Sequence, residues 1–396
     1  MLRDKTPQQH ELEMVAIDHL VPQDHLVRLV DLAIDFEFIR DEVAHLYCKN
    51  NGRPAVDPVR FFKYLFLGYL FGIQSERRLI KEVQVNVAYR WFLGLGLTDD
   101  VIHHSTLSQS RVKRFKDSNI YQSIFDNIVR QAMKQGLIGG HSLFADSTHL
   151  KANANKRRYD IEDLKVSPSV YVEQLNKAVI NDREAEGKKP LKYEEKEPCT
   201  KPTKVSRTDP DSGFMVRDEK PKGFFYLDHR VVDGKHGIIV DTHATAGNVH
   251  DSQPIIQRLD RVLDTFELNP IAVGLDAGYF TAAVCHNLEE RQLIGVLGYR
   301  RPNKKKCYFA KREYSYYADN DTYTCPQGEI LIYNTTNRLG YRQYHSTPKT
   351  CKDCPVRSQC TNSKNHIKVI TRHVWQASVE AANEIRLSEW GKKRYK

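Results

Sequence analysis

Two aspartates lie in apolar runs that favour β structure. Asp146 stands in the middle of the run 142–148, and Asp276 directly follows the run 271–275. An aspartate is costly to bury and poorly suited to a strand interior, so both positions point to a specific role. Two neighbouring carboxylates repel unless a cation lies between them, and their hard oxygens suit Mg²⁺ or Mn²⁺. If the two strands are neighbours, we expect Asp146 and Asp276 to hold a catalytic metal for phosphodiester displacement.

Structural roles are the alternative for these and nearby residues. Asp146 would then be a strand-end turn residue, and Asp276 would cap a short helix. His250 is a further candidate for contact with DNA or a metal, whereas Asp251 is expected to be the N-cap of the helix that follows it. His149 is interpreted as a strand-end or surface histidine.

A second chemical cluster consists of four of the eight cysteines. They follow the spacing Cys-x25-Cys-x2-Cys-x5-Cys, and they are Cys325, Cys351, Cys354 and Cys360. Four thiolates that include one x2 pair suit tetrahedral Zn²⁺. An Fe–S cluster, substitution of one sulfur by His345 or His366, and four unliganded cysteines remain the alternatives. Grouped cysteines in a chain without a secretion signal favour metal binding over disulfides.

Basic residues gather in two places along a chain of 396 residues whose formal net charge is +10. One group, which includes Lys304, Lys305 and Lys306, precedes the cysteines, and the other occupies the last residues, from Lys392. Such clusters suit a polyanion, and we predict that the three lysines contact DNA. A solvated surface without a ligand is the alternative.

The N-terminal third has the periodicity of helices. Asp57 and Pro58 predict a helix start, and a second helix is expected from Glu76 to Trp91. A third, capped by Ser105 or Thr106, should turn three apolar side chains inward: Leu107, Val112 and Phe115. Four polar side chains of the same helix are expected to reach solvent and contact DNA, as in the second helix of a helix-turn-helix: Gln109, Arg111, Lys113 and Arg114. An ordinary surface helix is the alternative.

From residue 142 the pattern changes to strands. Strand-like runs at 142–148, 223–229, 237–243, 271–275 and 294–299 are interleaved with two helical runs. The resulting order, three strands followed by helix, strand, helix and strand, is the order of an RNase H-like mixed α/β sheet, in which the first and fourth strands are neighbours. Residues 155–220 are polar and lysine-rich, and we interpret them as an insertion that contains one helix near residues 170–184.

Several segments carry a family resemblance: Phe144-Ala145-Asp146-Ser147-Thr148, Val273-Gly274-Leu275-Asp276-Ala277-Gly278-Tyr279, Thr208-Asp209-Pro210-Asp211-Ser212, Gly247-Asn248-Val249-His250-Asp251-Ser252, and the stretch from Val21 to Arg111. The first resembles the first-aspartate motif of bacterial insertion-sequence DDE transposases, and the second resembles their second-aspartate motif. The stretch from Val21 is similar to the helical domain that precedes catalysis in that family. The cysteine segment resembles a ribbon-like insertion of the same branch.

The resemblance implies a third acid, a glutamate on a helix within a Tyr-x2-Arg-x3-Glu signature. Tyr395 fits the opening tyrosine, which would place the arginine and the glutamate after Lys396. Glu380, Glu384 and Glu389 are the candidates within the sequence, although none of them has that context. The preferred interpretation is a chain truncated before its glutamate, and the loss of one metal ligand should reduce activity severely.

Composition excludes some other classes. The N-terminus is charged, and the most apolar run, from Phe61 to Ile73, is too short to span a bilayer, so we expect a cytoplasmic protein without membrane contact. Four segments are expected: a helical DNA-binding domain at 1–138, an RNase H-like catalytic domain at 139–300, a cysteine-rich insertion at 301–370, and the start of a C-terminal catalytic helix region at 371–396.

The sequence therefore predicts a transposase that cleaves and joins DNA at insertion-sequence ends with Mg²⁺ or Mn²⁺. Its expected partners are double-stranded DNA, as terminal inverted repeats and target, and a second copy of the chain in a homodimer. Two alternatives remain. One is an RNase H-like nuclease that cuts without strand transfer, and the other is a truncated, non-catalytic derivative that only binds DNA.

Overall fold

The computed structural model describes residues 14–48, 55–116, 118–165, 170–191, 200–216, 221–299 and 308–395. The predicted DNA contacts Lys304, Lys305 and Lys306 lie outside these residues. The chain divides into two compact units, residues 1–135 and residues 136–396.

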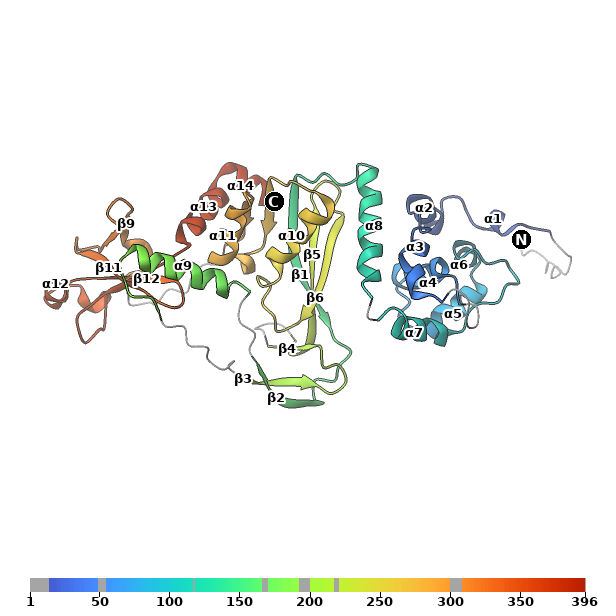
Figure 1. Ribbon diagram of the computed structural model, residues 1–396, viewed down its shortest axis with the longest axis horizontal. Helices are drawn as coiled ribbons and strands as arrows, with labels where there is room; N and C mark the ends of the chain where they lie inside the picture. The colour runs from blue at the N-terminus through green and yellow to red at the C-terminus, as the bar shows by residue number, and fades with distance from the viewer. Residues whose placement is uncertain are drawn as a thin grey trace, which may run out of the picture. The chain divides into compact units, whose positions relative to one another are not determined.

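Unit 1 is helical in its described part (Figure 1). Its helices are α1 (Ile17–Leu20), α2 (Leu26–Ala33), α3 (Ile39–Val43), η1 (Ala44–Leu46), α4 (Pro58–Leu70), α5 (Glu76–Val85), α6 (Val87–Phe92), α7 (His104–Lys113) and α8 (Ile120–Lys134). Asp57 caps α4 as predicted, because its side chain accepts hydrogen bonds from the backbone N–H groups of Val59 and Arg60. The core is aromatic, and the rings of Phe61 and Phe115 lie 5.1 Å apart within it.

The single helix predicted from Glu76 to Trp91 is wrong, because it is interrupted at Asn86. The backbone of Asn86 is extended, and its side chain accepts a hydrogen bond from the N–H of Tyr89. Asparagine side chains compete for backbone N–H groups in this way, so Asn86 ends α5 and caps α6 at the same time.

Unit 2 begins with a six-stranded sheet (Figure 1). Its strands are β1 (Ser142–Lys151), β4 (Gly213–Met215), β5 (Gly223–Asp233), β6 (Ile239–Ala246), β7 (Ala272–Leu275) and β8 (Ile294–Leu297), in the spatial order β4-β5-β1-β7-β8 with β6 paired to β5. The pairs β1–β7 and β7–β8 are parallel, whereas β4–β5, β1–β5 and β5–β6 are antiparallel. The predicted adjacency of the first and fourth main strands, β1 and β7, is therefore present.

Four helices follow the strands of this sheet: α10 (Ile255–Phe266), α11 (Ala282–Glu290), α13 (Gln376–Leu387) and α14 (Glu389–Tyr395). Two 3-10 turns, η2 (Ala277–Tyr279) and η3 (Lys311–Glu313), lie between β7 and β9 in sequence. Helix α13 packs against β8 and α11, so the C-terminal part of the described chain returns to the edge of the sheet (Figure 1). Buried side chains of β1, β7, β8 and α10 form the core.

A second sheet is fully antiparallel, in the order β13-β12-β11-β10-β9. Its strands are β9 (Ser315–Tyr317), β10 (Thr322–Thr324), β11 (Ile330–Thr336), β12 (Tyr341–His345) and β13 (Val369–His373), and the short helices α12 (Pro348–Lys352) and η4 (Arg357–Gln359) lie between β12 and β13 in sequence. Its small core contains Tyr314, Tyr323 and Tyr344. The cysteine segment is thus strand-rich, as expected.

The polar stretch 155–220 contains the hairpin β2 (Tyr159–Lys165) and β3 (Thr200–Ser206), with α9 (Val172–Ala185) between them in sequence. Helix α9 contacts the second sheet, and the residue before it contacts the turn before α10. Before its first turn, the hydroxyl of Tyr171 donates to the carbonyl of Ser252 over 2.6 Å. In its last turn, Arg183 donates to the carbonyl of Thr336 in β11 over 2.7 Å. The helix therefore ties the second sheet to the region before α10 (Figure 1).

Candidate active site

The register of β1 and β7 brings the two predicted acids together. Ala145 pairs with Leu275, and the next residue along each parallel strand is Asp146 or Asp276. The pairing ends at Ala145 and Leu275, and the backbone of Asp276 is still extended. Neighbouring strands lie about 4.8 Å apart, and residues at one register position point to the same face. Asp146 and Asp276 therefore directly follow the last paired positions of two neighbouring strands, at the carboxyl end of β7.

Neither acid is neutralised by a basic side chain. Asp146 and Asp276 are exposed and form no ion pair with any residue that the structure describes. Asp146 accepts a hydrogen bond from the N–H of Ser147 over 2.7 Å, and Asp276 accepts one from the N–H of Gly278 over 2.8 Å. Asp276 caps η2 by this bond, as its structural alternative predicted. Capping uses one carboxylate oxygen and leaves the other for a ligand.

A third aspartate approaches this pair, and its predicted role was wrong. Helix α10 begins at Ile255 with Pro254 as its N-cap residue, so Asp251 does not cap it. Asp251 is instead buried. A Cβ atom added to Gly278 would lie 3.0 Å from Oδ1 of Asp276 and 3.6 Å from Oδ2 of Asp251. Gly278 thus leaves open the space between the two carboxylates.

The phenol of Tyr279, which sequence reasoning did not single out, lies among the three acids. Burial raises the pKa of Tyr279, and the negative charges of Asp251, Asp146 and Asp276 raise it further. A hydrogen bond joins this phenol to the side chain of Ser147, the neighbour of Asp146 in β1. The sequence feature that could have indicated this role is the position of Tyr279, three residues after Asp276, which directly follows a strand.

The donor set suits a hard cation held by few protein ligands. In the part of the chain that the structure describes, no three His, Cys, Asp or Glu side chains are grouped closely enough to ligate one ion. The two exposed carboxylates form a pair, and Mg²⁺ commonly combines one or two carboxylates with water and substrate phosphate oxygens. Glu380, a predicted alternative third acid, is instead paired with Arg372 over 2.5 and 2.7 Å.

The predicted DNA-contacting helix exists as α7, with two corrections. Its N-cap is His103 rather than Ser105 or Thr106. Val112 is 56% exposed, whereas Leu107 and Phe115 are fully buried. Val112 lies five positions after Leu107, which rotates it by about 140° around a helix of 3.6 residues per turn, away from the core.

The four predicted DNA contacts of this helix differ in their surroundings. Gln109, Arg111 and Lys113 are exposed. Arg111 pairs with Glu76 over 2.8 Å, and the guanidinium of Arg114 lies 4.2 Å from the ring centre of Tyr47. Gln109 and Lys113 therefore remain the more available of the four for an external partner.

All four cysteines of the predicted zinc site line one pocket of about 370 Å³. Cys325 accepts a hydrogen bond at sulfur from the N–H of Gln327, in a turn that Gly328 closes with a positive φ of 83°. Cys351 donates to Ser346, and the hydroxyl of Tyr314 contacts Cys360 over 3.2 Å. The sulfurs thus share one pocket without forming a compact ligand group in the described residues.

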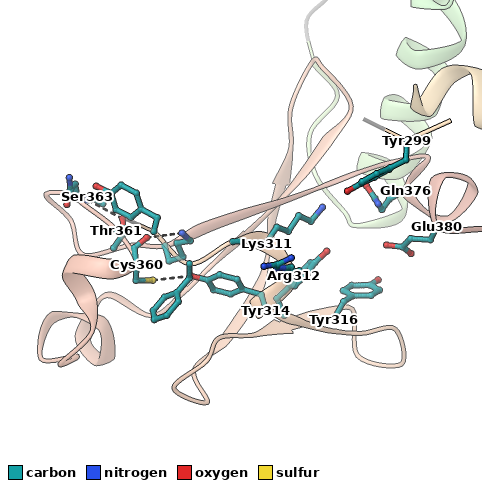
Figure 2. A pocket seen from close by; sticks show the side chains of 16 residues that line it. Tyr299, Lys311, Arg312, Tyr314, Tyr316, Cys360, Thr361, Ser363, Gln376 and Glu380 are labelled. Carbon is teal, nitrogen blue, oxygen red and sulfur yellow. Dashed lines mark hydrogen bonds between the residues drawn. The ribbon is translucent and has the colours of Figure 1, made fainter. Parts of the chain in front are cut away.

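A larger groove of about 1460 Å³ lies beside the second sheet. Figure 2 shows Lys311 and Arg312 between Tyr299 and Gln376 on one side and Tyr314 and Cys360 on the other. Aromatic side chains form much of its lining: Tyr299, Tyr308, Phe309, Tyr314, Tyr316 and Tyr323.

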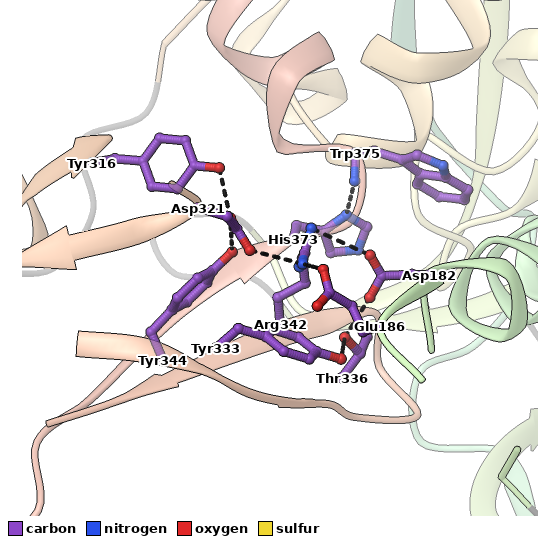
Figure 3. A network of polar contacts seen from close by, with 10 residues as sticks. All are labelled: Asp182, Glu186, Tyr316, Asp321, Tyr333, Thr336, Arg342, Tyr344, His373 and Trp375. Atoms are coloured by element: carbon purple, nitrogen blue, oxygen red, sulfur yellow. Dashed lines mark hydrogen bonds and ion pairs between the residues drawn. The ribbon is translucent and has the colours of Figure 1, made fainter. Parts of the chain in front are cut away.

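Acids in the second sheet region are, in contrast, closely partnered (Figure 3). Oδ1 of Asp321 accepts hydrogen bonds from the hydroxyls of Tyr316 and Tyr344 over 2.8 and 2.7 Å. The guanidinium of Arg342 lies 2.8 Å from Oδ2 of Asp321 and 3.4 Å from Oδ1 of Asp182, and it also pairs with Glu186. Arg342 therefore joins β12 to the C-terminal end of α9.

Comparison with known protein families decides the relationship. A family described as a transposase domain (DUF772) matches residues 15–113, and a family described as a transposase DDE domain matches residues 324–396. Both matches support an insertion-sequence DDE transposase. The first match covers α1 to α7 of this transposase, and the second contains Cys325, Cys351, Cys354 and Cys360, whereas Asp146 and Asp276 lie outside both matched ranges.

Other comparisons add no relative of this transposase. No curated protein matches the chain, and no solved structure matches it. Among the helices that the structure describes, none combines the length and the apolar character needed to cross a membrane.

Proposed function

We propose that this transposase cleaves DNA at the ends of its insertion sequence and joins the freed ends to target DNA, with Asp146 and Asp276 as ligands of a divalent cation. The observation that carries the proposal is the parallel pairing of β1 with β7, which ends at Ala145 and Leu275, the residues directly before the two acids. Their exposure and their lack of ion pairs among the described residues add support, since a metal site needs carboxylates that are free to bind.

The chemistry at this edge follows from the ligand type. A bound Mg²⁺ or Mn²⁺ would stabilise charge on the attacking and leaving oxygens of an in-line displacement. Asp146 and Asp276 would orient it, and Gly278 would keep the space beside Asp276 open. Water is then the first nucleophile and the freed 3′-hydroxyl the second, so no covalent bond to the protein is needed.

The arrangement of the first sheet supports an RNase H-like catalytic fold. Three antiparallel strands, β1, β5 and β6, adjoin the parallel strands β7 and β8, and helices α10 and α11 separate the later strands in sequence. Asp146 lies on the strand shared by the antiparallel and parallel halves.

Unit 1 is proposed to bind the double-stranded terminal repeats, and the complex is proposed to contain two copies of the chain. Gln109 and Lys113 extend from α7 into solvent. A nearby cleft is lined by Arg77, Arg111 and Glu76, among others, and guanidinium groups in a cleft suit a phosphate backbone.

We also propose a structural Zn²⁺ site for the four cysteines. They line one pocket, and the N–H group directed at the sulfur of Cys325 would stabilise a thiolate. Metal analysis of purified protein should find about one zinc per chain, and Cys354→Ser should reduce it. Zinc-free protein that unfolds at an unchanged temperature would contradict this assignment.

A cleavage assay on terminal-repeat DNA tests the catalytic proposal. Mn²⁺ should support slow cleavage by the chain. Asp146→Asn or Asp276→Asn should reduce that cleavage strongly, whereas Asp264→Asn in α10 provides a matched substitution away from the site. Cleavage without joining would favour an RNase H-like nuclease. DNA binding without cleavage in any metal would favour a derivative that only binds DNA.

A further inference from the structure

The groove beside the second sheet combines aromatic and cationic side chains. It is bounded by residues 308–316 on one side and by Tyr299 and the start of α13 on the other (Figure 2). Tyr299 is 46% exposed. The guanidinium of Arg386 lies 4.6 Å from the centre of the Tyr299 ring and packs on one of its faces. Tyr316 and Tyr323 belong to the packed lining of the groove.

Two of its cations have no anionic partner in the part of the chain that the structure describes. Lys311 and Arg312 are exposed, and neither makes a hydrogen bond or ion pair with another residue of the described ranges. The one acid of the lining, Glu380, is held by both terminal nitrogens of Arg372. Desolvation in the groove lowers the pKa of Lys311 and the positive charge of Arg372 lowers it further, whereas the negative charge of Glu380 acts in the opposite direction. An external anion beside Lys311 would relieve this repulsion.

The combination distinguishes between classes of ligand. Unpaired nucleic acid presents both phosphates and open base faces, and proteins bind it with a cationic groove and aromatic side chains on which bases stack. A duplex stacks its base faces inside the helix, so it would use the cations but not the ring of Tyr299. An acidic peptide would likewise leave the aromatic lining without a matching surface.

We propose that this groove binds an unpaired DNA strand, with Lys311 and Arg312 contacting phosphates and Tyr299 stacking on a base. The inference rests on the proposed function, because cutting and joining DNA ends creates locally unpaired strands. The groove lies in the same unit as the acid pair, and α13 at its border packs against β8, which pairs with the strand that precedes Asp276.

Fluorescence anisotropy with a labelled oligothymidylate of about 12 nucleotides tests the groove directly. The double variant Lys311→Ala/Arg312→Ala should weaken single-strand binding about 10-fold, and the log–log salt dependence should become shallower by about 1.4, the value for two phosphate contacts on a single strand. Tyr299→Ala should also weaken binding, whereas Tyr299→Phe should keep it. Lys349→Ala, an exposed lysine that does not line the groove, is the matched control.

Duplex DNA of the same length provides the second arm. The groove variants should leave duplex binding unchanged, because we assign that to unit 1. Equal losses for both DNA forms, or no loss for the single strand, would overturn the proposal. If the double variant is unstable, Lys311→Met, which keeps an apolar stem of similar length, replaces it. Failure of the catalytic proposal is separate, since Asp146→Asn should lose cleavage and retain oligothymidylate binding.

Discussion

Unit 2 contains two groups of acids, one without cationic partners among the described residues and one bound by an arginine. Asp146 and Asp276 are exposed at the edge of the first sheet, and each accepts a hydrogen bond from a nearby backbone N–H. Asp321 and Asp182, in the second sheet region, are bound by Arg342 and by neighbouring hydroxyl groups (Figure 3).

The difference separates carboxylates that stabilise the fold from carboxylates that remain available. A paired acid lowers the free energy of the folded chain when its hydrogen bonds are complete, and its charge is then not available to a ligand. Two adjacent acids without cationic partners repel, so removing one charge should cost the fold nothing. The comparison therefore predicts opposite consequences for similar substitutions in the two groups.

Asp146→Asn and Asp276→Asn should have the largest effect, and only on activity. Each removes a proposed metal ligand, so metal-dependent cleavage should fall about 1000-fold. The melting temperature without metal should stay equal or rise, because repulsion between the acids is relieved. Calorimetry with and without Mn²⁺, beside the cleavage assay, measures both. A large loss of stability would place these acids with the structural group.

Arg342→Met should have the reverse effect. It leaves Asp182, Glu186 and Asp321 near one another without their shared cation, and breaking such a partly buried network should cost about 3 kcal/mol of unfolding free energy. Urea denaturation measures the loss. Arg78→Met, which breaks an exposed pair with Glu82, is the control and should cost well under about 1 kcal/mol. Similar losses of unfolding free energy for Arg342→Met and Arg78→Met would contradict a special stabilising role of the Arg342 network.

Gly278→Ala should act on the available acids without changing their charge. The new Cβ would stand 3.0 Å from Oδ1 of Asp276, so the carboxylate must shift. Mn²⁺ affinity should fall about 10-fold, as for the loss of a supporting contact around a metal ligand. Titration calorimetry measures the Mn²⁺ affinity. Gly136→Ala is not a suitable control, because Gly136 has a positive φ and an alanine there would add strain.

The smallest effect is expected at His373, near the partnered acids. Burial, with the positive charges of His286 and Lys311, lowers the pKa of His373 from 6.5 to about 4. The unfolded chain therefore binds more protons between these values, and stability should fall as the pH drops from 6.5 toward 4. His373→Asn, whose Oδ1 can replace Nδ1 as the acceptor for the N–H of Trp375, should flatten this dependence. An unchanged slope in pH-dependent denaturation would contradict the assignment.

Local signals predicted much of the architecture. Asp57 and Pro58 marked the start of α4, and the apolar runs before and around Asp276 and Asp146 marked β7 and β1. The failures were positional. Asn86 divides the helix that periodicity predicts as one, and Asp251 lies in the turn before α10 rather than at the N-cap of that helix. In the first case a short polar side chain accepted a hydrogen bond from a nearby backbone N–H, and hydrophobic periodicity does not encode such a bond.

The sequence alone determined the residue types for the chemistry and the family, because strand-forming runs and acid motifs are local patterns. Tertiary structure decided which of those residues meet. The pairing of β1 with β7 placed Asp146 and Asp276 after neighbouring strand positions. The turn at Gly278 placed the carboxylates of Asp276 and Asp251 near the same glycine. The same is true of Arg342, whose three acidic partners come from α9 and from the turn between β9 and β10. Contacts between distant segments depend on the packing of the whole unit, and spacing along the chain does not specify them.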